Sequence, residues 1–426
     1  MRSDNVCHRQ EWHPVRITVT ALLVTGLLGA CSATASAPSL DERVGKGPGT
    51  GPASSRSAPE GDMPGIDGAG SPGGNGHNNG TGPAGTRDDG MRQVTMAFTG
   101  DTLTHSPLWA QAQRNAGGNG YDYTPMQARL TPLFDGVDLA VCHLETPIAP
   151  EGEEFSTAPA YGVQPEVVAG LAANGYDRCS TASNHTFDRG IAGIDRTVNV
   201  LAYNGLGQSG MARTPQESSP QVFEVNGVEI SHLSYTFGYN GIIPPAGQEW
   251  RSTLIDPARI IGDAVTARSR GAEVVVASLH WGDEGVAAPT DAQRSVAEAI
   301  TADGAIDLVV GHHAHVLQPT EKVNGTWVMF GLGNIISNLP DHPRWPAAAQ
   351  DAAVATTTVT IDRAGKVRVA RPVMHPTWVD RDHGWVVRVV QADLADPSTP
   401  PDIREQLRLS LDRTRMVLDP FIAKTP

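Results

Sequence analysis

The chain has 426 residues, of which 39% are hydrophobic, and its formal charge at pH 7 is −14. This length and apolar content are sufficient for a large buried core, but the negative charge argues against nucleic acid as a partner, because backbone phosphates would be repelled. The sequence has no lysine or arginine cluster that offsets the charge. An anionic substrate would therefore depend on bound metal and a few isolated arginines.

The first segment, residues 1–31, has the composition of a secretory signal. Three arginines precede an apolar run that is too short to span a membrane comfortably, and Cys31 follows it. The letters LLGAC resemble a lipobox, the site at which bacterial lipoproteins are cleaved and lipidated on cysteine. We expect Cys31 to carry the lipid that anchors an exported protein to the outside of the cell membrane. Cleavage at a small-residue pattern within 33–37 is the alternative.

The next segment, residues 32–90, is dominated by Gly, Pro, Ser and Ala. Such a composition buries too little apolar surface to offset the entropy lost on ordering. We therefore expect a disordered linker between the signal and a folded domain.

The folded domain is predicted over residues 91–390, where strand-like and helix-like segments alternate. Four amphipathic stretches each end at a glycine, the preferred residue just past a helix. These glycines are Gly175, Gly205, Gly271 and Gly304. The alternation predicts an α/β fold with a mostly parallel or mixed sheet. A hairpin turn is expected at 364–366, and residues 391–426 are expected to form a C-terminal helical extension.

Five of the predicted strands end on residues that bind metals. The predicted ligands are Asp101, Glu145, Asn184, His185, His280, His313 and His315. Because parallel strands end along one edge of a sheet, side chains far apart in sequence converge there. Imidazole nitrogen with carboxylate and amide oxygen, and no thiolate, suits Mn, Zn or Fe. We expect one or two of these ions.

The most specific of these segments is GHHAHV, which follows an apolar run. Alternate residues of an extended backbone point the same way, so His313 and His315 are predicted to face one site while His312 points elsewhere. A surface histidine run is the alternative, although it would hardly follow AIDLVV. His143, close before Glu145 on the same strand, is expected to be a core residue or to support a ligand.

Catalytic roles are predicted for His185, Asp188, Glu284 and His105. Asp188 is expected to orient a histidine, with capping of the helix that begins near Ile191 as a second role. Glu284 is expected to contact the substrate or a ligand, with a solvated loop acid as the alternative.

Cys142 and Cys179 both lie in predicted buried strands. Export permits a disulfide, but neighbouring parallel strands rarely offer the required geometry. The sequence therefore favours two buried free thiols.

Six motifs, in order across residues 94–338, resemble those of the CapA family of capsule or poly-γ-glutamate synthesis proteins. They are GDTLTH, HLET, SNHTFDRG, LHWGDE, GHHAHVLQP and FGLGNIISN. That family belongs to the calcineurin-like metallophosphatase superfamily. The resemblance implies a four-layer α/β/β/α sandwich with mixed sheets and a site for two divalent metals. It also implies that Glu145 is the bridging carboxylate, Asn184 the amide ligand and His185 the catalytic or ligand histidine.

Two positions depart from the superfamily pattern. Leu103 stands where the first motif usually has a histidine, and His105 replaces it only if the backbone bends. Glu145 stands where a shorter aspartate is usual. The sequence therefore supports a first metal better than a second.

The resemblance implies an accessory role in synthesis, anchoring or export of an anionic polymer, poly-γ-glutamate, beside membrane ligase and export components. A freestanding metal-dependent phosphoesterase of the cell envelope is one alternative, for which turnover of a phosphoester would be diagnostic. A non-catalytic, metal-dependent polyanion-binding module is another. That module would bind metal and ligand without turnover.

Overall fold

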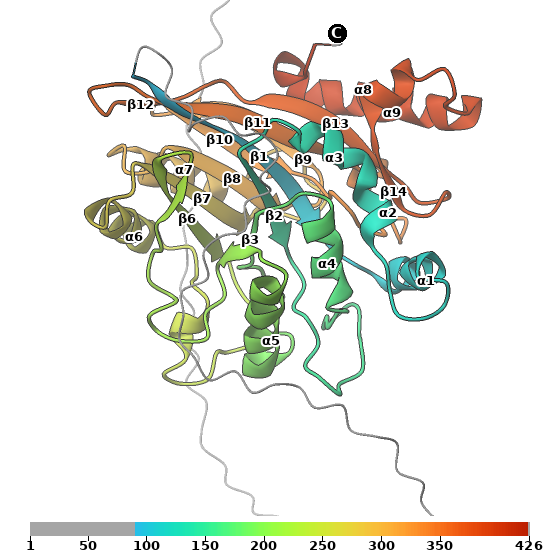
Figure 1. Cartoon of the computed structure of the whole chain (residues 1–426), viewed down its shortest axis with the longest axis horizontal. Coiled ribbons are helices and arrows are strands. Elements are labelled where there is room, and N and C mark those ends of the chain that lie inside the picture. Colours follow the sequence, from blue (N-terminus) through green and yellow to red (C-terminus); the bar gives the residue numbers. More distant parts are fainter. Residues whose placement is uncertain (1–89, 425–426) are drawn as a thin grey trace, which may run out of the picture. The chain divides into compact units, whose positions relative to one another are not determined.

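The computed structural model describes residues 90–424 (Figure 1). The predicted signal, its Cys31 and nearly all of the predicted linker lie outside the described residues. Among the described helices, none combines the length and the apolar character needed to cross a membrane.

Two mixed β-sheets form the centre of the fold (Figure 1). The larger has the strand order β14-β13-β11-β1-β2-β3-β4, with β12 paired to β11. Strands β1 to β4 are parallel, whereas β11 to β14 pair antiparallel. The strands are β1 Arg92–Thr102, β2 Leu139–Leu144, β3 Arg178–Ser180, β4 Gly207–Ser209, β11 Asp351–Ile361, β12 Val367–Val369, β13 Val373–Asp380 and β14 Val386–Val389.

The smaller sheet has the order β5-β6-β7-β8-β10-β9. Its inner strands β6, β7, β8 and β10 are parallel, and both edge strands are antiparallel to their neighbours. The strands are β5 Phe223–Val225, β6 Val228–Thr236, β7 Val274–Trp281, β8 Leu308–His313, β9 Leu317–Val323 and β10 Thr326–Leu332.

The helices are α1 Ser106–Asn115, α2 Thr124–Gln127, α3 Thr131–Phe134, α4 Glu166–Ala173, α5 Gly190–Tyr203, α6 Pro257–Ser269, α7 Asp291–Thr301, α8 Val390–Ala395 and α9 Pro401–Leu418. Short 3₁₀ turns cover Ala128–Leu130, Glu249–Arg251, Ala347–Gln350 and Asp419–Phe421. The predicted helix ends are confirmed at all four glycines, which have φ of 96°, 76°, 101° and 74° in chain order. Such positive φ values cost glycine little.

The layers follow from the alternation of side chains along each strand. In β2, Val141 packs between the two sheets, whereas Ala140 and Leu144 pack against helices α1, α2 and α4. In β7, Val276 packs between the sheets, and Val275 packs against α6 and α7. Helices thus cover the outer face of each sheet, and the predicted four-layer α/β/β/α sandwich is confirmed.

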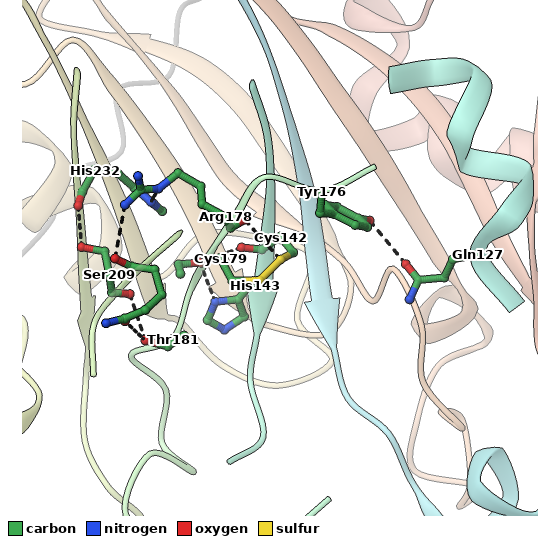
Figure 2. The surroundings of a disulfide bond; sticks show 11 residues. Gln127, Cys142, His143, Tyr176, Arg178, Cys179, Thr181, Ser209 and His232 are labelled. Atoms are coloured by element: carbon green, nitrogen blue, oxygen red, sulfur yellow. Dashed lines mark hydrogen bonds between the residues drawn. A yellow bond between two sulfur atoms is a disulfide. The ribbon is translucent and has the colours of Figure 1, made fainter. Parts of the chain in front are cut away.

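A disulfide joins Cys142 and Cys179, so the prediction of two free thiols is wrong (Figure 2). The two residues lie directly opposite each other on the parallel strands β2 and β3, with Cα atoms 4.4 Å apart. This separation is at the short end of the range that a disulfide spans. Both side chains belong to the core beneath the helices. The exact register of β2 and β3, which the sequence did not specify, is what permits the bond.

The C-terminal helix α9 packs on the larger sheet. Leu407 and Leu411 contact a small core around Trp378 of β13. Arg413 forms a two-pronged ion pair with Asp351 of β11, with N–O distances of 2.5 and 2.8 Å. The predicted terminal helix is therefore part of the packed structure.

Candidate metal centre

The predicted ligands meet where strands of both sheets end. Asp101 is near the end of β1, Glu145 follows β2, and His280 and His313 lie at the ends of β7 and β8. The remaining three residues lie in the loops that follow β3 and β8, because β3 already ends at Ser180. We call the seven residues the strand-end cluster: Asp101, Glu145, Asn184, His185, His280, His313 and His315.

Two glycines bring the strand ends close together. A Cβ atom on Gly100 would lie 2.0 Å from the Gly333 carbonyl oxygen, and one on Gly311 would lie 1.9 Å from that of Phe330. Only glycine permits such an approach of two backbones. The glycines that precede Asp101 and the GHHAHV histidines are therefore required for the site to form.

Glu145 lies at the centre of the cluster. Its Oε1 atom is 3.6 Å from His315 Nε2 and 4.0 Å from Nε2 of both His185 and His280. The side chain is fully buried, yet neither carboxylate oxygen has a hydrogen-bond partner in the described part of the chain. A buried carboxylate without donors is unfavourable unless a cation binds it.

Asp101 contacts the end of β8 and the loop after it through both of its oxygens. Oδ2 accepts a hydrogen bond from the backbone N–H of His313 at 3.0 Å and lies 3.1 Å from His315 Nδ1. Oδ1 lies 3.2 Å from His312 Nδ1. Asp101 thereby connects the larger sheet to the histidine segment of the smaller one.

The histidine segment differs from the prediction. Both His313 and His315 have positive φ, 86° and 56°, so the backbone is not extended beyond β8. The turn nevertheless leaves ligand atoms of His313, His315 and Glu284 within 4.8 Å of one another. The prediction that His312 points elsewhere is wrong, because its ring, carried by β8, lies beside Asp101.

His143 and His312 also lie beside Asp101, and all three side chains are buried with ligand atoms within 4.8 Å of one another. The two rings are stacked, with centroids 4.0 Å apart and an angle of 12° between planes. An imidazole lone pair lies in the ring plane, so two stacked rings do not point nitrogens at one ion. We therefore do not assign this trio as a joint metal site.

Neighbouring side chains fix how the ligand histidines are protonated. His315 Nδ1 lies 2.8 Å from Asn334 Oδ1, and the Asn334 amide N–H groups bond backbone carbonyls of His315 and Ala349. The amide oxygen therefore faces the imidazole, which carries its hydrogen on Nδ1. Its Nε2 faces Glu145, and once it has lost its own proton it can bind a metal there.

His185 is held in the same way by Asp188. The distance from Nδ1 to Asp188 Oδ2 is 2.7 Å, and the same oxygen accepts the Tyr161 backbone N–H at 2.7 Å. Arg189 is the N-cap residue of α5, so the alternative that Asp188 caps this helix is wrong. The His185 side chain is 12% exposed, whereas the His280 side chain is fully buried. His185 is therefore the cluster histidine placed to meet a substrate.

The structure places His105 apart from the cluster. Its Nε2 lies 3.0 Å from the Tyr161 hydroxyl, and its Nδ1 lies 3.1 Å from the Leu103 carbonyl oxygen. Leu103 packs in the core beneath the helices. Among the described residues, none of the three groups of potential ligands contains His105.

Burial and charge distribute protons unevenly within the cluster. Burial raises the pKa of Glu145 to about 8, against the opposing influence of His315. Burial alone lowers the pKa of His315, but the charges of Glu145 and Asp101 outweigh it and raise this pKa to about 10. Burial alone would raise the pKa of Asp101, but the close imidazole nitrogens of His312 and His315 outweigh it and hold this pKa well below its usual range. Burial lowers the pKa of His313 to about 3.

The donor set fits a divalent cation. The buried atoms without a hydrogen-bond partner among the described residues include several at the strand-end cluster and beside it. These are Asp101 Oδ1, both Glu145 carboxylate oxygens, His313 Nδ1 and both ring nitrogens of His312. A cation would satisfy the carboxylates at the centre. Carboxylate, amide and imidazole ligands without thiolate are compatible with Mn, Zn or Fe.

His143 was expected to be a core residue or to support a ligand, and it contacts His280 and stacks on His312. The sequence reasoning missed two other residues that shape the site, His312 and Asn334, which orients His315. The letters GHHAH did contain a signal for His312, since they place an extra histidine beside the predicted ligands. Nothing in the sequence FGLGNIISN distinguishes Asn334 from an ordinary loop asparagine.

Comparison with known proteins identifies the class to which this fold and site belong. The model of the family described as "Bacterial capsule synthesis protein PGA_cap" matches residues 95–339. This match covers more than half of the chain, which therefore belongs to that family.

Two relatives illustrate the similarity. The chain is 26% identical over 247 residues to the PGA biosynthesis protein CapA of Bacillus subtilis, covering 57% of this chain and 63% of the relative. It is 24% identical over 252 residues to the capsule biosynthesis protein CapA of Bacillus anthracis, covering 57% and 60%. The chain thus spans less than two thirds of each relative. Among solved structures, the calcineurin-like phosphoesterase YfkN of Bacillus subtilis has 14% identity and a TM-score of 0.41, covering 76% of this chain and 99% of that one.

Proposed function

We propose that this protein is exported, anchored to the outside of the cell membrane through Cys31, and assists synthesis, anchoring or export of poly-γ-glutamate. The observation that carries the polymer assignment is the family match over residues 95–339. Support for the location comes from the arginines, apolar run and cysteine of residues 1–31. Membrane ligase and export components are the partners that such a role requires.

The strand-end cluster is proposed to hold one or two divalent ions. Asp101, Glu145 and His315 would hold one, since their ligand atoms lie within 4.8 Å of one another. Glu145 also faces His280, which with Asn184 and His313 would hold a second. A bound divalent ion would act as a Lewis acid toward an oxyanion of the substrate.

The protein's own residues supply positioning and proton transfer around that ion. His185 is partly exposed, and Asp188 keeps the hydrogen on its Nδ1, so Nε2 is available to accept or return a proton. Glu284 is exposed beside His313 and His315 and is placed to contact a substrate group. The half-exposed ring of Phe237 contacts His313, with 4.5 Å between ring centroids.

A freestanding phosphoesterase is the second candidate. Nε2 atoms of three histidines, His185, His280 and His315, lie 3.6 to 4.0 Å from Glu145 Oε1, and a carboxylate shared by several imidazoles is suited to a pair of ions. Hydrolysis of generic phosphomonoesters and phosphodiesters by the purified protein with added Mn²⁺ would favour this candidate.

The polymer role is tested in the organism that encodes the chain. We expect disruption of the gene to reduce surface poly-γ-glutamate, and expect the wild-type gene to restore it while the Glu145→Gln variant does not. Export of the variant is verified by its presence in the membrane fraction. Unchanged polymer after disruption would contradict the proposed role.

A further inference from the structure

A continuous chain of buried hydrogen bonds lies behind the strand-end cluster. Ser180 Oγ is 2.8 Å from His143 Nδ1, His143 Nε2 is 2.9 Å from His280 Nδ1, and His280 Nε2 is 2.8 Å from Asn184 Oδ1. The four residues come from β2, β3, β7 and the loop after β3, so the chain crosses from one sheet to the other. Figure 2 shows His143 next to the disulfide residue Cys142 on β2.

In the metal-free protein, the orientation of the Asn184 amide determines which atom donates in each of these hydrogen bonds. Its Nδ2 donates to Asn240 Oδ1 at 3.1 Å, so Oδ1 faces His280. An amide oxygen only accepts, so His280 carries its hydrogen on Nε2 and accepts at Nδ1. His143 then donates from Nε2 to His280 and accepts at Nδ1 from the Ser180 hydroxyl.

Metal binding requires the opposite direction. On the proposed function, on which this inference rests, an ion is bound by His280 Nε2 and Asn184 Oδ1. The ring nitrogen that binds an ion carries no hydrogen, so the His280 hydrogen must be on Nδ1. Nδ1 then donates to His143 Nε2, and His143 donates from Nδ1 to Ser180 Oγ.

We propose that His143 is a positioning residue that lets the metal ligand His280 change tautomer. Metal binding takes the place of the Asn184–His280 hydrogen bond and reverses the two hydrogen bonds that run from His280 through His143 to Ser180. Each imidazole loses a proton at Nε2 and gains one at Nδ1 by exchange with solvent, so both stay neutral. Ser180 keeps its hydroxyl hydrogen but turns it to the Cys142 carbonyl oxygen, 3.4 Å away. The Cys142 carbonyl oxygen is the only new acceptor that this reversal requires.

Only a side chain that both donates and accepts can serve at position 143. His280 is fully buried, and without His143 its Nδ1 hydrogen would have no acceptor in the metal-bound state. A buried donor left unpaired opposes the state that requires it. An apolar side chain at position 143 would therefore weaken metal binding specifically. A glutamine could still donate to His280 or accept from it, so it would serve both the metal-free and the metal-bound state.

The test combines affinity with direct observation of the tautomers. We expect His143→Leu to weaken Zn²⁺ binding, measured by chelator competition, by about 10- to 100-fold, as loss of an outer-shell partner does in other sites. His143→Gln is expected to recover most of that loss, and Ser180→Ala to show a smaller loss. His375→Gln is the matched control, because this histidine lies on β13, beyond β11 and β1 from β2, and bonds Thr356. It should bind Zn²⁺ as wild type does.

Long-range ¹H–¹⁵N spectra of histidine-labelled protein provide the second readout. In the wild type, His280 should carry its hydrogen on Nε2 without metal and on Nδ1 with Zn²⁺, and His143 should switch in step. Should His143→Leu not fold, the Ser180→Ala affinity and these spectra decide the question. Normal Zn²⁺ affinity in folded His143→Leu, or one unchanged His280 tautomer in wild type, would overturn the positioning role alone. Absence of Zn²⁺ binding by wild type would overturn the proposed metal site and this inference together.

Discussion

At the scale of single residues, the decisive feature is the buried carboxylate of Glu145. Three imidazole nitrogens surround one of its oxygens at 3.6 to 4.0 Å, and none is close enough for a strong hydrogen bond. This spacing leaves both carboxyl oxygens without a hydrogen-bond partner among the described residues, while three imidazole nitrogens lie near one of them. The residue is therefore arranged for a cation, not for an ion pair with a histidine.

Replacing this carboxylate should abolish tight metal binding. Loss of a residue that only hydrogen-bonds a metal ligand lowers metal affinity by about 10- to 100-fold. Glu145→Gln removes the charge of a direct ligand, so it should lower affinity by more than about 100-fold. The measurement is chelator competition with Zn²⁺ or Mn²⁺. Glu321→Gln, which removes an exposed carboxylate paired with Arg294, is the control and should leave affinity unchanged. Equal affinities of the two variants would exclude Glu145 as a ligand.

Metal affinity should rise with pH. In the metal-free protein the pKa of Glu145 is raised to about 8 and that of His315 to about 10, so both groups hold protons at neutral pH. Both must lose these protons to bind an ion, so lowering the pH favours the metal-free form and weakens binding. Calorimetry in buffers with different ionisation enthalpies should detect proton release at pH 7. Affinity that does not change between about pH 6 and 9 would contradict these proton positions.

At the scale of elements, the disulfide fixes the pairing of β2 with β3, the two strands that lead to Glu145 and Asn184. It closes a loop with a sequence separation of 37. The double variant Cys142→Ala, Cys179→Ala should lose about 2–4 kcal/mol of unfolding free energy, by the usual effect of such cross-links on the unfolded chain. Urea unfolding measures this loss of stability, and a thiol assay of unreduced, denatured wild-type protein tests for the disulfide. Two free thiols at Cys142 and Cys179 in the wild type would contradict the disulfide.

The elements also show where sequence reasoning succeeded and where it failed. Helix ends were predictable, because Gly175, Gly205, Gly271 and Gly304 each stop an amphipathic pattern. The turn through His313 and His315 was not predictable, because alternate side chains point the same way only while the backbone stays extended. The backbone of this turn, which has positive φ at both residues, is held by contacts such as the hydrogen bond from the His313 N–H to the carboxylate of Asp101, which is far away in sequence.

At the scale of the whole molecule, the site depends on the meeting of two sheets. The larger sheet supplies Asp101 and Glu145, and the smaller supplies His280 and His313. The sequence predicted that strand ends converge, because each apolar run stops on a ligand-type residue. It did not predict how the sheets are offset, and this offset is what places His143 of one sheet against His280 and His312 of the other.

The most direct test of a metal centre at these strand ends is the metal content of the purified protein. After equilibration with Mn²⁺ or Zn²⁺ and dialysis, elemental analysis should find one or two ions per chain, and none in Glu145→Gln. Folding of the variant is verified by its thermal unfolding. Wild-type protein that retains no divalent ion, or a variant that retains as many ions as wild type, would contradict the assignment of the strand-end cluster as a metal centre.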